Sequence, residues 1–315
     1  MKKWMPFLFL MCFGVLAQAQ QKKLVVAQDG SGDHTTLQSA VDAIPAFPNE
    51  RLEIHIKNGT YREKLVISSW KTKLSFIGED KDKTIIVWND YSGKGNINTF
   101  TSYTVLVQGN EFRAENLTFQ NSAGPVGQAV ALHVEADRCV FKNCRILGDQ
   151  DTLYTGVDNS RQYYVNCYIE GTTDFIFGPA TAFFENCIIH CKKNSYITAA
   201  STPQNQPYGY VFLNCTVTAS PAATKVYLGR PWRPFAQTVF LNTTLGEFIR
   251  PEGWHNWSKP EAEKTTFYAE YNSKGPGAAP EKRVSWSKQL SKKEARKLAK
   301  AEVVLAGQDH WNPRR

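Results

Sequence analysis

Apolar residues recur through the middle of the chain in six short blocks of similar pattern, each built around an asparagine. Apolar or aromatic residues precede the asparagine, and another apolar residue follows three positions after it. Successive asparagines are 27, 23, 20, 28 and 28 residues apart, so the pattern is a repeat. The blocks are Phe112–Phe119, Cys139–Ile146, Gln162–Ile169, Ala182–Ile189, Tyr210–Val217 and Thr238–Leu245, with Asn116, Asn143, Asn166, Asn186, Asn214 and Asn242.

A repeat of 20–28 residues with one strong strand in each copy predicts a solenoid of stacked coils. Leucine-rich repeats have a similar period, but their L-x-x-L-x-L pattern is absent from the chain. Cysteines directly follow four of the asparagines, which indicates ladders of like residues along the stack. The pattern therefore predicts an all-β fold, a right-handed parallel β-helix. The four cysteines are Cys144, Cys167, Cys187 and Cys215.

The segments on either side of the repeats predict strands and two covering helices. Upstream, short apolar bursts separated by turn residues favour strands. Residues 34–46 predict an amphipathic helix that covers the open end of the solenoid. Residues 291–305 predict one final helix, with Ser291 as its N-cap and Glu294 three residues later. A loop rich in Trp, Gly and Pro is expected between the last block and about residue 285.

The first residues have the pattern of a secretory signal peptide. Lys2 and Lys3 precede a short apolar core, Trp4–Leu16, and an Ala-x-Ala site ends at Ala19. We therefore expect a signal peptide over residues 1–19 and a single β-helix domain over residues 20–315. The apolar core is too short to span a membrane, and no later segment is long and apolar enough. A secreted or periplasmic protein is expected, and a capped solenoid is expected to be a monomer.

The formal net charge falls from +8 to +6 when Lys2 and Lys3 are removed with the signal peptide. A moderately basic exported protein suits a polyanionic polysaccharide, although a solvated basic surface explains the same charge. The basic residues are scattered except for a group between 292 and 300, which is typical of the wet face of a helix and not of a nucleic-acid site.

The remaining cysteines leave two interpretations open. Stacked positions lie within the Cα separation that a disulfide tolerates, and Cys167–Cys187 is the best candidate pair for an exported protein. Equally, cysteine is a small buried residue that fills such a ladder as a thiol. A metal site is not expected, because the chain has no paired C-x-x-C and no histidines at ligand spacing.

Two aspartates occupy the same place in consecutive repeats. Asp151 lies eight residues after Asn143, and Asp174 lies eight residues after Asn166. Neighbouring strands are about 4.8 Å apart, so the two carboxylates should lie close together on adjacent coils. Taken alone, such a pair also fits a Ca²⁺ site or a hydrogen-bonded structural ladder.

Polar loops near the two aspartates carry further candidate catalytic groups. Asp174 is followed by Phe-Ile-Phe, so it needs a cation to stay ionised, and Arg230 is the natural partner. Repulsion between two carboxylates leaves one protonated and the other charged, an acid beside a nucleophile. Gln128 and Gln150 offer N–H donors for a developing oxyanion.

These segments together resemble the pectinesterase (pectin methylesterase) family over nearly all of the expected mature chain. The resemblance rests on GTYRE at 59–63, QAVAL at 128–132, QDTLY at 150–154, DFIFG at 174–178, LGRPW at 228–232 and FYAEYNSKGPGA at 267–278. The departures are Asp149 where the family commonly has an aromatic, Thr173 in place of valine and Ala269 in place of glycine.

The resemblance implies hydrolysis of methyl esters in pectin (homogalacturonan) without metal or cofactor. Asp174 matches the family nucleophile, which attacks the C6 carbonyl of a methylated galacturonate. Asp151 matches the acid that protonates methanol and then the base that activates water. Gln128 and Gln150 match the oxyanion stabilisers, and Arg230 matches the group that orients Asp174 and helps to bind substrate.

Aromatic residues and one threonine complete the expected substrate site. Trp232 and Tyr154 offer flat faces for a sugar ring, and Thr99 matches a further substrate contact in the family. Phe175 and Phe177 are expected mainly in the core, with Phe177 also placed to touch substrate. Two other kinds of function stay open: a β-helix polygalacturonase or lyase, and a protein that binds polyuronate without altering it.

Overall fold

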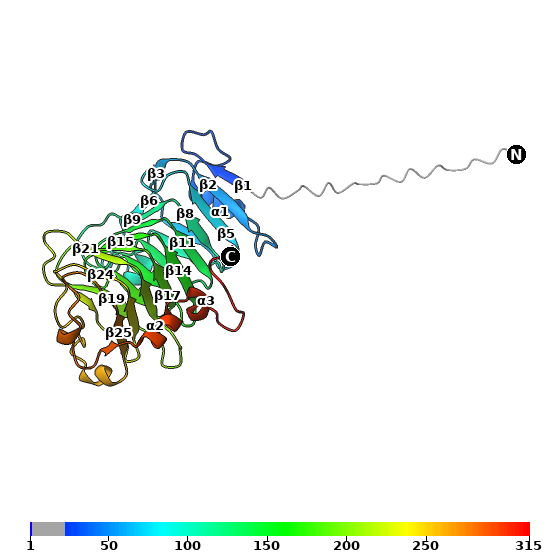
Figure 1. Ribbon diagram of the computed structural model, residues 1–315. Coiled ribbons are helices and arrows are strands. Elements are labelled where there is room, and N and C mark those ends of the chain that lie inside the picture. Colours follow the sequence, from blue (N-terminus) through cyan, green and yellow to red (C-terminus); the bar gives the residue numbers. More distant parts are fainter. Residues whose placement is uncertain (2–22) are drawn as a thin grey trace.

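The repeats fold into stacked coils that form a parallel β-helix, as predicted (Figure 1). This computed structural model describes residue 1 and residues 23–315, so the predicted signal peptide after Met1 lies outside the described residues. Three sheets of eleven, eight and seven strands make up the coils. After one coil the chain returns to the same sheet, and the strands of consecutive coils therefore pair in parallel.

The strands of each sheet come from every coil in turn. The eleven-stranded sheet contains β1 (Lys23–Val26), β2 (Leu52–Ile56), β5 (Leu74–Gly78), β8 (Arg113–Glu115), β11 (Cys139–Lys142), β14 (Arg161–Val165), β17 (Thr181–Glu185), β20 (Tyr210–Leu213), β23 (Gln237–Leu241), β25 (Phe267–Tyr271) and β26 (Lys288–Gln289). The eight-stranded sheet contains β3 (Gly59–Tyr61), β6 (Thr84–Trp88), β9 (Thr118–Asn121), β12 (Arg145–Leu147), β15 (Tyr168–Gly171), β18 (Ile188–Cys191), β21 (Thr216–Ala219) and β24 (Thr244–Leu245). The seven-stranded sheet contains β4 (Leu65–Ile67), β7 (Val105–Val107), β10 (Leu132–Val134), β13 (Leu153–Thr155), β16 (Ile176–Gly178), β19 (Tyr196–Ala200) and β22 (Tyr227–Gly229).

The repeat asparagines form the corner between the eleven-stranded and eight-stranded sheets. All six adopt φ between 51° and 58°, a left-handed conformation that asparagine tolerates better than most residues. Their amides join neighbouring coils, as where Asn143 Nδ2 donates to Asn116 Oδ1 at 2.6 Å. Asn272 is a seventh member, with φ of 51° and a bond to Asn242 Oδ1 at 2.8 Å. The expected loop after residue 245 therefore contains one more strand, β25.

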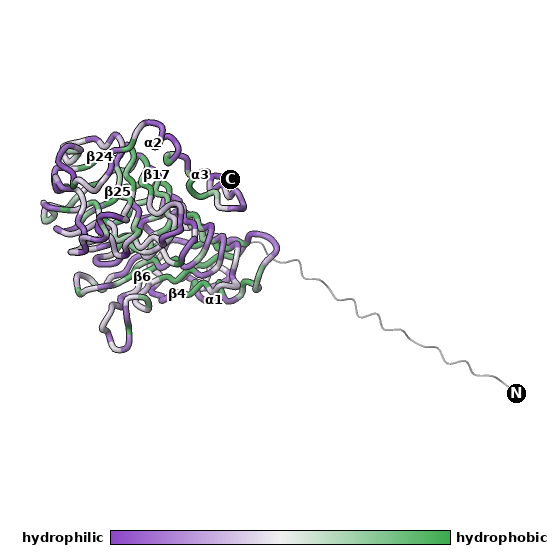
Figure 2. The backbone as a smooth tube through the Cα atoms, turned by 90° about the horizontal axis from the view of Figure 1, so that it is seen from below, coloured by the Kyte–Doolittle hydropathy of each residue, from purple (hydrophilic) through white to green (hydrophobic). Residues whose placement is uncertain are grey.

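Aromatic side chains form a continuous column inside the coils. Adjacent rings stack with centroids 4.5–4.8 Å apart and interplanar angles of 11° or less. Figure 2 shows apolar backbone positions running through the interior of the stack, with polar positions outside. The column fixes the register of the coils, because a shift of one residue would turn every ring to the outer face. Its members are Phe141, Tyr164, Phe184, Phe212 and Phe240.

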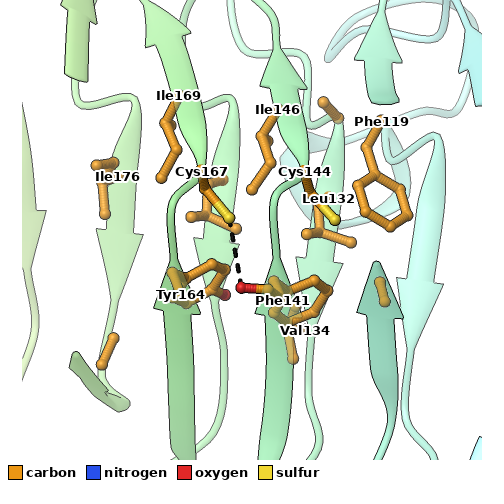
Figure 3. Close-up of a cluster of buried hydrophobic side chains, with 14 of the residues drawn as sticks. Phe119, Leu132, Val134, Phe141, Cys144, Ile146, Tyr164, Cys167, Ile169 and Ile176 are labelled. Carbon is orange, nitrogen blue, oxygen red and sulfur yellow. Dashed lines mark hydrogen bonds between the residues drawn. The ribbon is translucent and has the colours of Figure 1, made fainter. Parts of the chain in front are cut away.

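The cysteine ladder consists of thiols. Cys167 Sγ donates to the carbonyl of Phe141 in the preceding coil at 3.4 Å, the dashed contact in Figure 3. Cys187 repeats this contact one coil later with Tyr164 O, at 3.5 Å. All six cysteines among the described residues are free and buried. The candidate disulfide Cys167–Cys187 is therefore not formed, and the thiols fill the ladder instead.

The N-terminal end of the stack is covered by a short helix, α1 (Leu37–Ala43), within the predicted segment. Its Leu37, Ala40 and Val41 are buried in the core. Gln38 accepts from the N–H of Val66 at 2.9 Å and donates to its carbonyl at 3.3 Å. These bonds satisfy the exposed backbone of the edge strand β4, which would otherwise be open to pairing with another chain.

The C-terminal segment forms two short helices, α2 (Lys292–Leu298) and α3 (Ala301–Val304), and not the single predicted helix. The first ends at Ala299, which still bonds to Ala295 O, because Lys300 adopts extended backbone. The predicted cap is confirmed, since Ser291 and Glu294 form a capping box. Both helices pack against the outer face of the eleven-stranded sheet, on Val140, Tyr163, Phe183, Val211, Val239 and Ala269.

Candidate active site

Asp151 and Asp174 occupy equivalent positions at the start of neighbouring strands in the seven-stranded sheet. Leu153 pairs with Ile176, which sets the two aspartates opposite each other. Both have positive φ, 63° and 50°, in the left-handed region that aspartate tolerates at tight corners. Only 5% and 6% of their surfaces are exposed. The coil spacing thus brings together two buried carboxyl groups, as the equal offsets predicted.

Arg230 binds the Asp174 carboxylate with both arms of its guanidinium fork. Nε donates to Oδ1 at 3.0 Å and an Nη2 hydrogen goes to Oδ2 at 2.6 Å. Arg230 directly follows β22, two coils beyond Asp174, and its own N–H is fixed on Thr198 O at 2.9 Å. Paired charge-assisted bonds of this kind fix the direction of a carboxylate as well as its charge.

The two carboxyl groups differ in their electrostatic surroundings. Burial first, and then the charge of Asp174, raise the pKa of Asp151 to about 8, while the Gln128 amide and Arg230 oppose the rise. Burial also raises the pKa of Asp174, but the hydrogen bonds and charge of Arg230 counter it. At neutral pH the proton therefore lies on Asp151, and Asp174 is the ionised partner.

Two glutamine amides line the same corner of adjacent coils. The backbones of Gln128 and Gln150 pair as an isolated parallel bridge between coils, so the two residues lie side by side. Thr99 Oγ1 donates to Gln128 Oε1 at 2.8 Å, which leaves the Gln128 amide hydrogens for the site. Thr99 belongs to the 3₁₀ turn η1 (Thr99–Thr101), whose first residues are capped by Asn98. Within residues 23–315, the Gln150 side chain has no hydrogen bond, so its donors are also free.

Aromatic residues form a strip along the outer face of the seven-stranded sheet beside the carboxylates. The ring of Phe177 lies 4.9 Å from Tyr154 and 6.0 Å from Trp232. Phe100 extends the strip, 5.3 Å from Tyr154. Phe175, in contrast, is wholly buried in the interior core. Tyr154, Trp232 and Phe100 also line an open cavity of about 500 Å³, large enough for sugar units.

Two larger cavities lie away from these groups, against the C-terminal segment. One, of about 560 Å³, is bounded by Pro313–Arg315 and the eleven-stranded sheet, and the other, of about 600 Å³, by residues 303–309 and Arg161. Neither is lined by an aspartate or glutamine of the site, so cavity volume alone does not identify the active site.

Two further residues of the site carried no recognisable signal in the sequence. Tyr196 and Trp257 both lie against the guanidinium of Arg230. Tyr196 lies opposite Asp174 one coil later, but it comes ten residues after Asn186 and not eight, so the offset that located the two aspartates does not reach it. Trp257 comes from an irregular loop, and only the folded chain brings it to the site.

A protonated carboxyl group, an arginine-bound carboxylate and two neighbouring amides on a β-helix form a site suited to a carboxylic-ester hydrolase. The pectinesterase family model matches residues 23–308, and the chain belongs to that family. It is 42% identical to pectinesterase 31 of Arabidopsis thaliana over 288 residues, 88% of this chain and 90% of that protein.

A solved structure and several longer relatives agree with this assignment. Pectin methylesterase from carrot superposes with a TM-score of 0.86 at 35% identity, covering 93% of this chain and 96% of the carrot chain. The chain is also 39% identical to the probable pectinesterase/pectinesterase inhibitor 21 of Arabidopsis thaliana over 305 residues, 92% of this chain. It spans only 45% of that protein and about half of several similar ones.

Proposed function

We propose that this enzyme hydrolyses the methyl esters of galacturonate units in pectin, releasing methanol and leaving free carboxylates on the polymer. The observation that carries the proposal is the Asp174 carboxylate, fixed by Arg230 beside the protonated Asp151. Family membership supports the substrate class. No metal or cofactor takes part in the proposed steps.

Asp174 attacks the ester carbonyl carbon and forms an acyl-enzyme anhydride. The negative charge that develops on the carbonyl oxygen is stabilised by N–H donors of Gln128 and Gln150. Asp151 gives its proton to the departing methoxide, which leaves as methanol. Asp151 then takes a proton from water as this water attacks the acyl carbon, and Asp174 is released as a carboxylate. Arg230 keeps Asp174 aligned through both steps.

The aromatic strip gives the polymer its binding surface. Tyr154 and Trp232 present apolar faces on which sugar rings lie, and the buried Phe177 supports both rings from beneath. Thr99 and Arg230 add polar contacts, because the Nη1 donors of Arg230 are not used by Asp174. Thr99 also positions Gln128, so it serves both binding and the oxyanion site.

The test is methanol release from highly methylated pectin in EDTA, with polymer length followed in the same sample. Methanol without shortening is the expected result. Shortening without methanol would assign the Asp pair to chain cleavage, as in a polygalacturonase or lyase. Binding without either product would indicate a polyuronate-binding protein.

The pH dependence of methanol release should be bell-shaped. The alkaline limb is expected near pH 8, because Asp151 must carry its proton to act as the acid and its pKa is raised to about 8. The acidic limb reflects protonation of Asp174. Initial rates from pH 4 to 10 at low substrate concentration check this, and activity that still rises above pH 9 would contradict the role of Asp151.

Replacing Gln150 with leucine should lower kcat by about 10²- to 10³-fold, the usual loss for one oxyanion donor. KM should change little, because the donor acts mainly on charge that develops in the transition state. Gln120→Leu, on the eight-stranded sheet, is the matched control and should keep full activity. A raised KM with unchanged kcat in Gln150→Leu would make Gln150 a substrate contact only.

The proposed substrate and the N-terminal sequence pattern together indicate the cellular setting. We infer that residues 1–19 are a signal peptide, that residues 20–315 form one domain, and that the monomeric enzyme meets methylated pectin outside the cytoplasm as a secreted or periplasmic protein. Among residues 23–315, no helix has the length and apolar character needed to cross a membrane. N-terminal sequencing of the exported protein tests the cleavage after Ala19.

A further inference from the structure

The guanidinium of Arg230 is enclosed by two aromatic rings. Its Cζ lies 3.9 Å from the ring centroid of Tyr196 and 3.6 Å from that of Trp257. Among the described residues these two rings make no ring contact with each other, so they approach the cation from different sides. The edge of the guanidinium that carries Nε and Nη2 faces Asp174.

Tyr196 is fixed by the coil stacking. It occupies the position after Asp174 in the ladder and accepts the Asp174 N–H at its own carbonyl, at 2.8 Å. Its ring stacks on Tyr227 of the next coil, with centroids 5.3 Å apart and planes 10° apart. The Tyr196 ring is therefore held against Arg230 by the seven-stranded sheet.

Trp257 reaches Arg230 from a loop that is tied to the same strand end. The His255 N–H donates to Gly229 O at 3.1 Å, next to Arg230. His255 Nδ1 then accepts the Trp257 N–H at 2.9 Å and supports the left-handed backbone of Trp257, with φ of 57°. Burial and nearby arginines lower the pKa of His255, which keeps this nitrogen an acceptor.

We propose that Trp257 is a positioning residue, which with Tyr196 holds the Arg230 guanidinium in the plane that aligns Asp174 for attack. This inference rests on the proposed function, in which Asp174 is the nucleophile. Two rings on the faces of the cation exclude water and contribute cation–π attraction. In the resulting low dielectric the charge of Arg230 acts more strongly on Asp174 than it would in water. The carboxylate is then ionised and directed before substrate arrives.

The test compares Trp257→Ala with Trp257→Phe in methanol release across pH. Trp257→Ala should lower kcat by about tenfold or more, the equivalent of a desolvated cation–π contact, with little change in KM. Its acidic limb should move to higher pH, because a loosened Arg230 lowers the pKa of Asp174 less effectively. Trp257→Phe keeps an aromatic face and should recover most of kcat and the original limb.

Trp70→Ala is the control for loss of a tryptophan, since Trp70 lies 48% exposed at the N-terminal end of the fold. Equal thermal unfolding of all variants establishes intact folding. A raised KM with unchanged kcat would make Trp257 a substrate contact, and an unmoved acidic limb with reduced kcat would also overturn the proposal. Activity retained in Asp174→Asn would refute the nucleophile assignment itself, independently of Trp257.

Discussion

Asp174→Asn is expected to lower kcat/KM for methanol release by about 10⁴-fold or more. The amide has nearly the shape of the carboxylate and its oxygen can accept one of the two Arg230 hydrogen bonds, but it cannot form the acyl-enzyme bond. The coils should still form, because side-chain volume is unchanged, but stability should fall because Arg230 loses its counter-ion. Pectin binding should survive, since the aromatic strip is untouched.

The measurement pairs initial rates on methylated pectin with binding of the polymer in affinity electrophoresis. Asp82→Asn is the matched control, an exposed aspartate paired with Arg145 at 2.9 Å, and it should keep full activity. Retention of activity within about tenfold in Asp174→Asn would place the nucleophile elsewhere. Loss of binding as well as rate would show that Asp174 acts on the polymer and not only on the ester.

Asp151→Asn is expected to lower kcat by about 10²- to 10⁴-fold and, in contrast, to stabilise the fold at alkaline pH. The rate falls because the amide cannot donate the proton that methoxide needs. The stability effect follows from the pKa, raised by burial from 3.8 to about 8. Between these values the unfolded chain releases the proton while the folded protein retains it, so stability decreases as pH rises. Asparagine removes that penalty, which over a shift of this size amounts to roughly 5 kcal/mol at pH 8.

Thermal unfolding at pH 4 and pH 8 checks the stability part of this prediction. The difference in Tm between Asp151→Asn and the parent protein should be small at pH 4 and should widen at pH 8. Asp82→Asn, whose carboxyl group is exposed, should show no such widening. An equal difference at both pH values would mean that Asp151 titrates normally in the folded protein.

Local sequence periodicity was sufficient for the architecture and for the central pair. The repeat asparagines predicted the stacked coils, and the structure places them at the coil corners, where asparagine tolerates the left-handed backbone. Equal offsets from Asn143 and Asn166 predicted that Asp151 and Asp174 are neighbours, because coil register carries equal positions into contact. The pattern was incomplete where blocks differ, and Asn272 was missed because its block lies in a segment dominated by Trp, Gly and Pro.

Elements without a repeat partner could not be predicted in the same way. The break between α2 and α3 falls at Lys300, which has no repeat partner, and the thiol state of Cys167 was one of two interpretations that the sequence left open. The enclosure of Arg230 likewise depends on an irregular loop that carries Trp257 to the site.

The sequence by itself determined the parallel coils, the asparagine and cysteine ladders, the adjacent carboxylates and the resemblance to pectinesterases. These are properties of short motifs and of their spacing, and coil stacking converts spacing directly into proximity. Only the tertiary structure decided which carboxyl group holds the proton, how Arg230 grips Asp174, and that Tyr196 and Trp257 enclose it. Those features depend on burial and on contacts between segments without a common period, which no local pattern encodes.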